Sequence, residues 1–339
     1  MIINSERQHA TQMPQHNMSQ YTHHSHHNAQ NGHHLHMPLS NQTYHPAELT
    51  PFLFARHTIA CERHPDRNED SIVVDERSGL AAVFDGVGGS AAGQIASQTA
   101  VRATQQSWRR VLEQIQKKRK VYDLLDNPGE NFLCSVLERL VKNADDLVRT
   151  EGAQRAGTDD LATTVALAAV CREPKLRGYT LFYAHVGDSR VYLLRDDEPL
   201  KRLTNDDGLL AKLVENQVVK DEDAHRIDQA MRADQLSDME FSYFRLRGGI
   251  TQALGGPVPP MIHTNEIAVK PGDRILLCTD GIHDNLTDEE IEDVLRNSPR
   301  TSTARVLVEH SLRRSRQERS ETVRAKPDDM SAIVMTCRL

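Results

Sequence analysis

Short apolar runs bounded by polar turns recur along most of the chain. The runs at residues 71–75 and 80–85 have the length and composition of strands, and Ser78-Gly79 between them predicts a turn. Later runs predict strands at residues 162–171, 179–186, 190–194, 262–269, 274–279 and 331–336. The first three of these later runs follow one another closely, and we expect them to pair as consecutive antiparallel strands.

Amphipathic segments separate groups of these runs. Apolar positions every three or four residues predict helices over about residues 91–118, 131–149, 221–233 and 301–316. Thr287 followed by Glu290 is a capping-box signature and predicts a further helix start. Because strands in adjacent runs alternate with grouped helices, the pattern predicts an α+β fold in which antiparallel sheets pack against helices.

Residues 1–50 differ from the rest of the chain, since they contain ten of its seventeen histidines and almost no charged residues. Such a segment buries too little apolar surface to offset the entropy of ordering it, so we expect a disordered His-rich tail. A histidine cluster can bind zinc, nickel or copper, but irregularly spaced, exposed imidazoles more often bind nothing specific. Residues 51–339 are the predicted globular domain.

The charge and cysteine content of the chain limit the kinds of partner and the cellular compartment that we expect. The net charge of -7 arises from acidic and basic residues mixed along the chain, which favours neither nucleic acid nor an anionic membrane as a partner. The five cysteines are widely separated, without the spacing of a zinc site, as expected of buried thiols in a reducing compartment. Neither a secretory signal nor a membrane span is visible, so we expect a cytoplasmic protein.

Carboxylates recur at the ends of the apolar runs. Asp85 ends LAAVF, Asp280 ends RILLCT, Asp328 precedes AIVM, and Glu69-Asp70 precede SIVV. One aspartate at a strand end is an ordinary turn former. A buried carboxylate, however, is costly unless it is paired or binds a cation. Several of them together therefore favour a cation site.

The donor set indicates the metal and the chemistry. Asp85 and Asp280 are each followed by glycine, which lets a backbone carbonyl approach an ion. Hard oxygen donors without His or Cys favour magnesium or manganese. Two such ions about 3.5–4 Å apart can activate a bridging water and clamp phosphate oxygens, without a nucleophilic side chain.

These residues lie within a longer ordered set of segments. RNEDS, VFDGVGGSAAG, LATTVALAAV, AHVGDSRVYLL, ITQALGG, LLCTDGIHDNL and DDMSAIVM resemble the metal-dependent protein phosphatases, the type 2C serine/threonine phosphatases in their bacterial-like form. The match runs from about residue 60 to residue 336. The resemblance implies a four-layer αββα sandwich, two antiparallel β-sheets flanked by helices, and hydrolysis of phosphoserine and phosphothreonine.

The resemblance also assigns roles to individual residues. Asp85, Asp280 and Asp328 would be the catalytic carboxylates, and two Mn²⁺ or Mg²⁺ ions would be held by Glu69, Asp70, Asp85, Gly86, Asp280 and Asp328. A weaker third ion would lie at Asp159 and Asp284, with Asp160 as the alternative to Asp159.

The sequence departs from the family in places. The position of the family's phosphate-binding arginine is Pro65, and the flanking Arg63 and Arg67 are equal candidates to replace it. Val87 stands where some members carry a histidine proposed as the general acid, so protonation would fall to a metal-bound water or to the substrate's surroundings. His283 is an alternative acid, although a helix-start or packing role is more common for such a histidine. Residues 205–248 correspond to the flap, which is longer than expected, and its extension is where partner specificity is expected.

Three other functions compete with this interpretation. The fold could serve as a pseudophosphatase, a regulatory binding module without metals; retention of Asp85, Asp280 and Asp328 argues against this. The chain could instead be a metal-binding protein whose role is set by the His-rich tail. It could also be a different dinuclear hydrolase that acts on small phosphate esters. The favoured reading is a monomeric enzyme acting on a phosphorylated protein, and the partner that the resemblance suggests is a serine/threonine kinase.

Overall fold

Two five-stranded antiparallel sheets form the centre of the fold in this computed structural model, which describes residues 51–87, 91–119, 132–155, 161–173 and 178–338. The first sheet has the order β1 (Phe52–Ile59), β12 (Met330–Cys337), β11 (Arg274–Cys278), β8 (Arg190–Leu194), β9 (Lys201–Arg202). The second has the order β10 (His263–Val269), β7 (Gly178–Val186), β6 (Val165–Glu173), β3 (Leu80–Phe84), β2 (Ser71–Asp75). A short ladder joins β4 (Gly86–Val87) to β5 (Ala162–Thr163).

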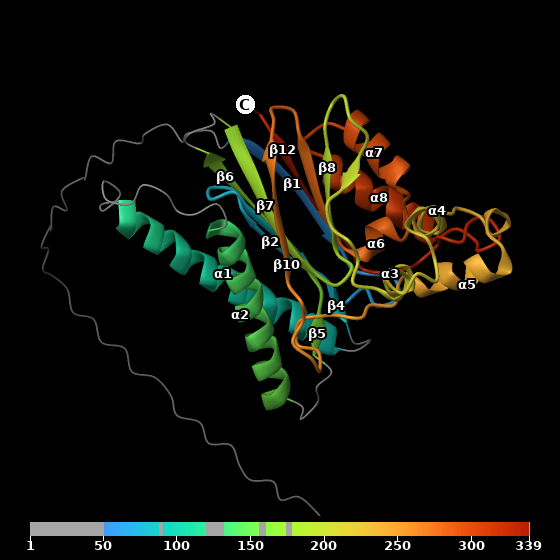
Figure 1. Cartoon of the computed structure of the whole chain (residues 1–339), viewed down its shortest axis with the longest axis horizontal. Helices are drawn as coiled ribbons and strands as arrows, with labels where there is room; N and C mark the ends of the chain where they lie inside the picture. The colour runs from blue at the N-terminus through green and yellow to red at the C-terminus, as the bar shows by residue number, and fades with distance from the viewer. Residues whose placement is uncertain (1–50, 88–90, 120–131, 156–160, 174–177, 339) are drawn as a thin grey trace, which may run out of the picture. The chain divides into compact units, whose positions relative to one another are not determined.

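Helices cover the outer face of each sheet (Figure 1). The second sheet packs against α1 (Ala91–Arg119) and α2 (Phe132–Arg155). The first sheet packs against α6 (Asp280–His283), α7 (Asp288–Asn297) and α8 (Thr303–Ser315). The order of layers is therefore helix, sheet, sheet, helix, which confirms the predicted αββα sandwich.

Side-chain alternation along the strands builds this layering. In β3, Leu80, Ala82 and Phe84 belong to the core under α1 and α2, whereas Ala81 and Val83 belong to the core between the sheets. Successive side chains of a strand point to opposite faces, so a strand buried on both faces is apolar throughout. This explains why the central runs read as continuous apolar segments rather than as alternating ones.

The flap is a small helical unit beside the sandwich (Figure 1). It contains α3 (Leu209–Glu215), α4 (Asp221–Asp228), the 3-10 turn η2 (Ala233–Gln235) and α5 (Asp238–Leu246). Leu210, Ile227 and Phe244 are buried in its own apolar core. The helix predicted over residues 221–233 ends early, at Asp228. The carbonyl oxygens of Asp228 and Ala230 accept hydrogen bonds from Arg324 instead of continuing the helix.

A buried charge network ties the flap to the first sheet. Arg190 of β8 is buried and binds Asp206 at 2.6 Å and Asp228 of α4 at 3.3 Å. Arg202 and Arg247 lie 3.5 and 4.0 Å from Asp228. Burial alone would raise the pKa of Asp228, but the surrounding arginines lower it below its ordinary value. The inner end of the flap is therefore held by paired charges that lie out of water.

Most predicted elements are confirmed, including the α7 cap, where the Thr287 hydroxyl accepts from the Glu290 amide. β6 and β7 pair as expected. The prediction that residues 190–194 pair with β7 is wrong, because β8 pairs with β11 and β9 in the other sheet. Gly187 between β7 and β8 has φ of 91°, a conformation that glycine adopts without strain and that redirects the chain.

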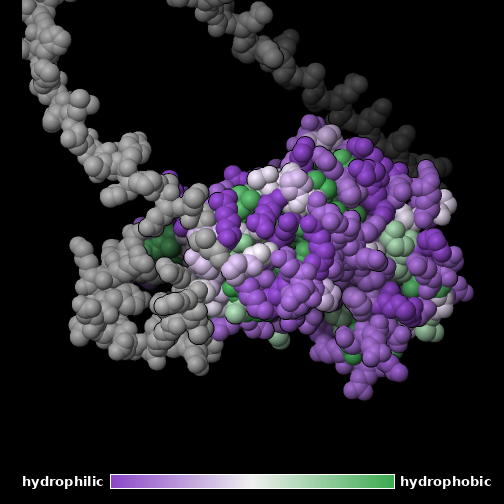
Figure 2. Space-filling view, turned by 90° about the horizontal axis from the view of Figure 1, so that it is seen from above, coloured by the Kyte–Doolittle hydropathy of each residue, from purple (hydrophilic) through white to green (hydrophobic). Residues whose placement is uncertain are grey.

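The surface seen in Figure 2 is mostly hydrophilic, with small separate hydrophobic groups. No helix among the described segments has the length and apolar character needed to cross a membrane. The described residues belong to one unit, residues 49–339. The predicted tail, residues 1–50, lies outside the described residues.

Candidate metal centre

The predicted carboxylates converge where strands of the two sheets end. Asp85 follows β3, Asp70 directly precedes β2, Asp280 opens α6 after β11, and Asp328 lies two residues before β12. Burial raises the pKa of Asp85 well above its ordinary value, and the charges of Asp280, Asp70 and Asp328 raise it further. Four residues far apart in sequence thus lie within electrostatic reach of one another.

Asp85 has no partner for its charge among the described residues. Within the described part of the chain, its carboxylate makes no hydrogen bond and no ion pair, although its backbone is held by Thr163 and Thr164. Asp70, in contrast, accepts a hydrogen bond of 2.8 Å from the Thr279 hydroxyl. Asp85 is only partly exposed, and an ionised carboxylate that is withdrawn from water without a partner is costly. Because no described residue supplies a counter-charge, a bound cation would stabilise Asp85.

Close backbone packing fixes the loops that carry these groups. A Cβ on Gly86 would collide with the backbone of Gly93 at the start of α1, and a Cβ on Gly281 would collide with the Asp329 carbonyl. Asp329 accepts hydrogen bonds of 2.6 Å from the backbone amides of Cys61 and Glu69. The glycines after Asp85 and Asp280 thus serve close packing, and Asp329 holds the Glu69 segment beside β12.

Lys326 contacts three of the acidic residues. Its ammonium forms an ion pair with Asp280, lies 2.8 Å from Asp284 and lies 3.1 Å from Asp328. Burial would lower the pKa of Lys326, but these three carboxylates raise it well above its ordinary value. Lys326 thus neutralises part of the charge of Asp280, Asp284 and Asp328. Nothing in the sequence pattern indicated this role, because Lys326 stands in a polar segment.

The comparisons with known proteins decide the family. A model of the family described as protein phosphatase 2C matches residues 60–326. The chain belongs to the protein phosphatase 2C family.

Relatives of this family member include characterised bacterial proteins. The serine/threonine protein phosphatase PstP of Mycobacterium tuberculosis is 32% identical over 247 residues, which cover 73% of this chain and 39% of PstP. The serine/threonine phosphatase stp of Listeria monocytogenes is 25% identical over 233 residues, 68% of this chain and 78% of that protein. The chain thus spans well under half of PstP and most of the Listeria protein.

Solved structures agree with the fold. The M. tuberculosis phosphatase PstP/Ppp superposes with a TM-score of 0.62 at 26% identity, covering 85% of this chain and 99% of that one. A structure of the PstP catalytic domain in complex with two manganese ions has a TM-score of 0.59, also at 26% identity and with the same coverage.

The donors present in this protein phosphatase 2C chain fit hard divalent ions. Asp70, Asp85 and Asp280 all have raised pKa values, first because of burial and then because of the neighbouring carboxylates. Glu69 has an oxygen, Oε1, that is buried without a hydrogen-bond donor. Carboxylate oxygens that are gathered at one place and repel one another are suited to Mn²⁺ or Mg²⁺.

The two arginine candidates are placed differently. Arg67 Nε lies 3.2 Å from Glu69 Oε1, so its charge faces a predicted metal ligand. Arg63 is exposed and makes no ion pair with any described residue. It lines a cavity of ≈ 790 Å³ beside the carboxylates. The structure therefore separates two residues that the sequence left equivalent.

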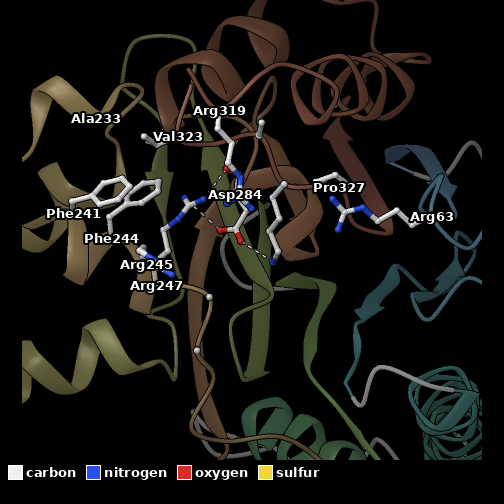
Figure 3. Close-up of a pocket in the computed structure, with 14 residues that line it drawn as sticks. Arg63, Ala233, Phe241, Phe244, Arg245, Arg247, Asp284, Arg319, Val323 and Pro327 are labelled. Carbon is white, nitrogen blue, oxygen red and sulfur yellow. Dashed lines mark hydrogen bonds and ion pairs between the residues drawn. The ribbon is translucent and has the colours of Figure 1, made fainter. Parts of the chain in front are cut away.

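That cavity lies between the flap and the segment before β12. Figure 3 shows Phe241 and Phe244 on one side, Arg63 with Pro327 on the other, and Asp284 between them. Arg247 Nη1 lies 3.5 Å from Asp284 Oδ1, and Lys326 contacts the other oxygen. Asp284 is thus already paired with two cations. Its predicted partners at a third ion, Asp159 or Asp160, lie outside the described residues.

His283 is unsuited to act as a general acid at neutral pH. Its ring is buried, and Nε2 lies 3.1 Å from the Asp188 carbonyl oxygen. Burial lowers its pKa to about 4, so the imidazole is neutral at pH 7. The neighbouring Asp188 and Arg190 do not pair with each other. Arg190 pairs with Asp206 and Asp228, while Asp188 lies near Asp280.

Asp85→Asn should stabilise the metal-free protein, because it removes one charge from a repelling group. A raised folded-state pKa means that stability is present at low pH and is lost as pH rises through that pKa. The gain over wild type in EDTA should therefore be larger at pH 8 than at pH 5. Thermal melts of both proteins, with exposed Asp197→Asn as the control, check this. A melting point below that of wild type at pH 8 would contradict the unpaired state of Asp85.

Lys326→Met should tighten Mn²⁺ binding, because the ammonium competes with the ion for Asp280 and Asp328. At an effective dielectric near 20, loss of a unit charge at 4–5 Å is worth a few kcal/mol, so we expect the Mn²⁺ dissociation constant to fall about tenfold or more. Titration followed by thermal shift measures it. Lys270→Met, at an exposed position, should leave the constant unchanged.

Proposed function

We propose that this chain is a metal-dependent protein phosphatase that hydrolyses phosphoserine and phosphothreonine. The observation that carries the proposal is the carboxylate of Asp85, which has no hydrogen bond or ion pair with any described residue and lies within electrostatic reach of Asp70, Asp280 and Asp328. Membership in the protein phosphatase 2C family supports the reaction class, and the names of the PstP and stp relatives support the substrate class.

Glu69, Asp70, Asp85, Gly86, Asp280 and Asp328 would hold two Mn²⁺ or Mg²⁺ ions. Such ions supply Lewis acidity toward the phosphate and lower the pKa of water. The protein's own contribution is placement: Asp329 fixes the Glu69 backbone, and the Thr279 hydroxyl orients Asp70. Asp284, together with Asp159 or Asp160, stays a prediction for a third ion.

Arg63 is the residue that we assign to the substrate phosphate. Its guanidinium is free of ion pairs with the described residues and lines the cavity beside Lys326. A guanidinium can bind two phosphate oxygens at once, with charge-assisted hydrogen bonds. Arg67 would act indirectly, because it contacts Glu69 and so orients a metal ligand.

The cavity further indicates the kind of sequence around the phosphorylated residue. Arg63, Arg245 and Arg319 line it, and none of the three forms an ion pair with a described residue. Phe241 and Phe244 add an apolar wall from the flap (Figure 3). Unpaired cations at a partly apolar surface favour an acidic ligand. We therefore assign a preference for phosphopeptides with acidic residues near the phosphate.

A pseudophosphatase is the second candidate, and Lys326 is the observation that favours it. An ammonium placed among Asp280, Asp284 and Asp328 could stand in for a metal ion. It leaves Asp85 without a partner, however, which is why we prefer the enzyme. A kinase partner, a monomeric state and a cytoplasmic location stay predictions from the sequence.

The proposed activity predicts Mn²⁺-dependent turnover of phosphothreonine peptides that EDTA abolishes. Asp85→Asn should lower kcat by about a thousandfold or more, because the central ligand is lost.

Arg63→Ala should raise KM about tenfold or more, the effect of losing a charge-assisted contact of about 1.5–3 kcal/mol. Arg67→Ala should instead raise the Mn²⁺ requirement. Steady-state kinetics at varied peptide and metal separate the two. Full activity of Asp85→Asn would exclude the mechanism.

The acidic preference predicts that Arg245→Glu combined with Arg319→Glu lowers kcat/KM about tenfold for a phosphopeptide with flanking acidic residues. The small ester p-nitrophenyl phosphate has no flanking residues that could contact these arginines, so its turnover should be unchanged. Exposed Arg77→Glu is the matched charge reversal. An equal loss of kcat/KM on both substrates would mean that the variant damages the metal centre rather than the peptide contacts in the cavity, and would contradict the acidic preference.

A further inference from the structure

A second group of potential metal ligands lies outside the carboxylate centre. His185 on β7 and His263 on β10 are direct cross-strand partners. Their rings stack with centroids 4.8 Å apart and an interplanar angle of 21°. Asp207, from the loop after β9, places Oδ1 3.0 Å from His263 Nε2. One ring nitrogen from each histidine and one oxygen of Asp207 lie within 4.8 Å of one another.

His185 is arranged as metal-binding histidines commonly are. The residue is 5% exposed, and its Nε2 lies 2.7 Å from the carbonyl oxygen of Asn205. A carbonyl only accepts, so Nε2 carries the proton and Nδ1 carries the lone pair. That Nδ1 is buried and has no hydrogen-bond partner. Metal-bound histidines typically donate their other N–H to a carbonyl or carboxylate in this way, which fixes the tautomer.

Asp207 connects this group to both ends of the flap. Its Oδ2 accepts from the Gly187 amide at 2.9 Å, and its backbone carbonyl accepts from the Thr251 amide at 2.7 Å. Gln252 donates to Oδ1 at 3.0 Å. Asp207 thus lies at the point where the chain leaves the sandwich for α3 and meets the segment returning after α5. A metal bound there would fix the root of the flap.

We propose that His185, Asp207 and His263 form a binding site for a borderline divalent ion, zinc in the first instance, at the flap root. Two imidazoles and one carboxylate are a common ligand set for zinc, whereas the catalytic carboxylates favour harder ions. Ligand atoms around tetrahedral zinc lie roughly 3.4 Å apart, so these atoms, now within 4.8 Å of one another, would approach by up to roughly 1.4 Å. His263 is 38% exposed, which gives its ring room to rotate and gives the ion a path of entry.

The competing account is a hydrogen-bonded His263–Asp207 pair that binds no ion. It explains the 3.0 Å contact but leaves the buried Nδ1 of His185 without a partner. The two accounts differ in whether zinc stabilises the folded protein through His263. Zinc taken up by the histidines of residues 1–50 would be common to all variants.

The test is thermal unfolding of the full chain in saturating Mn²⁺, with and without Zn²⁺, for wild type, His263→Gln and His225→Gln. Glutamine can still donate to Asp207, and exposed His225 on α4 is the matched control. At roughly a hundredfold excess over its dissociation constant, zinc should raise the melting temperature of wild type and of His225→Gln by roughly 5 °C. His263→Gln should lose more than half of that shift.

A second measurement locates the ion. Zn²⁺ soaked into crystals of the wild-type chain should give an anomalous peak between His185, Asp207 and His263. An equal thermal shift in wild type and His263→Gln, no shift in any protein, or an anomalous peak only at the carboxylate centre would each overturn the proposal.

Discussion

Mutual repulsion among carboxylates is the constraint on which the rest of the structure depends. Asp70, Asp85, Asp280 and Asp328 reach one place from both sheets. Burial and the neighbouring carboxylates raise the pKa values of Asp70, Asp85 and Asp280, so each of these three would be easier to fold as a neutral residue. The fold offers partial compensation, since Lys326 pairs with Asp280 and the Thr279 hydroxyl donates to Asp70, whereas no described residue pairs with the Asp85 carboxylate. The remaining negative charge is what we expect divalent cations to neutralise. The same repulsion that lowers the stability of the metal-free protein should therefore increase its affinity for metal ions.

The layered fold could be predicted from the sequence because its signals are local. Continuous apolar runs such as residues 80–84 indicate strands covered on both faces, and Thr287 with Glu290 marks a helix start. The sheet to which β8 belongs could not be predicted, since it depends on the backbone at Gly187 and on ion pairs that Arg190 makes with residues much later in the chain. Which strands pair depends on tertiary contacts, and the spacing of apolar residues along one strand does not predict them.

Some residues of the candidate site could likewise be predicted from the sequence, and others could not. The carboxylates were visible because aspartates at the ends of buried strands are unusual in number, and the structure brings them together. Lys326 was not visible, because a lysine in a polar segment normally points to solvent; only the three carboxylates around it make it part of the centre. Arg63 and Arg67 look alike in sequence, and only their contacts distinguish a free guanidinium from one that faces Glu69.

The buried arginines at the base of the flap bear on how this domain can be varied. Arg190 and Arg324 are almost completely buried, and the groups that satisfy them include Asp206 and the Asp228 segment of the flap. A chimera that exchanged the flap alone would leave a guanidinium enclosed without its counter-charge, which typically costs about 3–5 kcal/mol. Natural or engineered changes of substrate preference are therefore easier at the outer helix α5 than at α4, and the inner half of the flap is expected to be inherited together with the sheet beneath it.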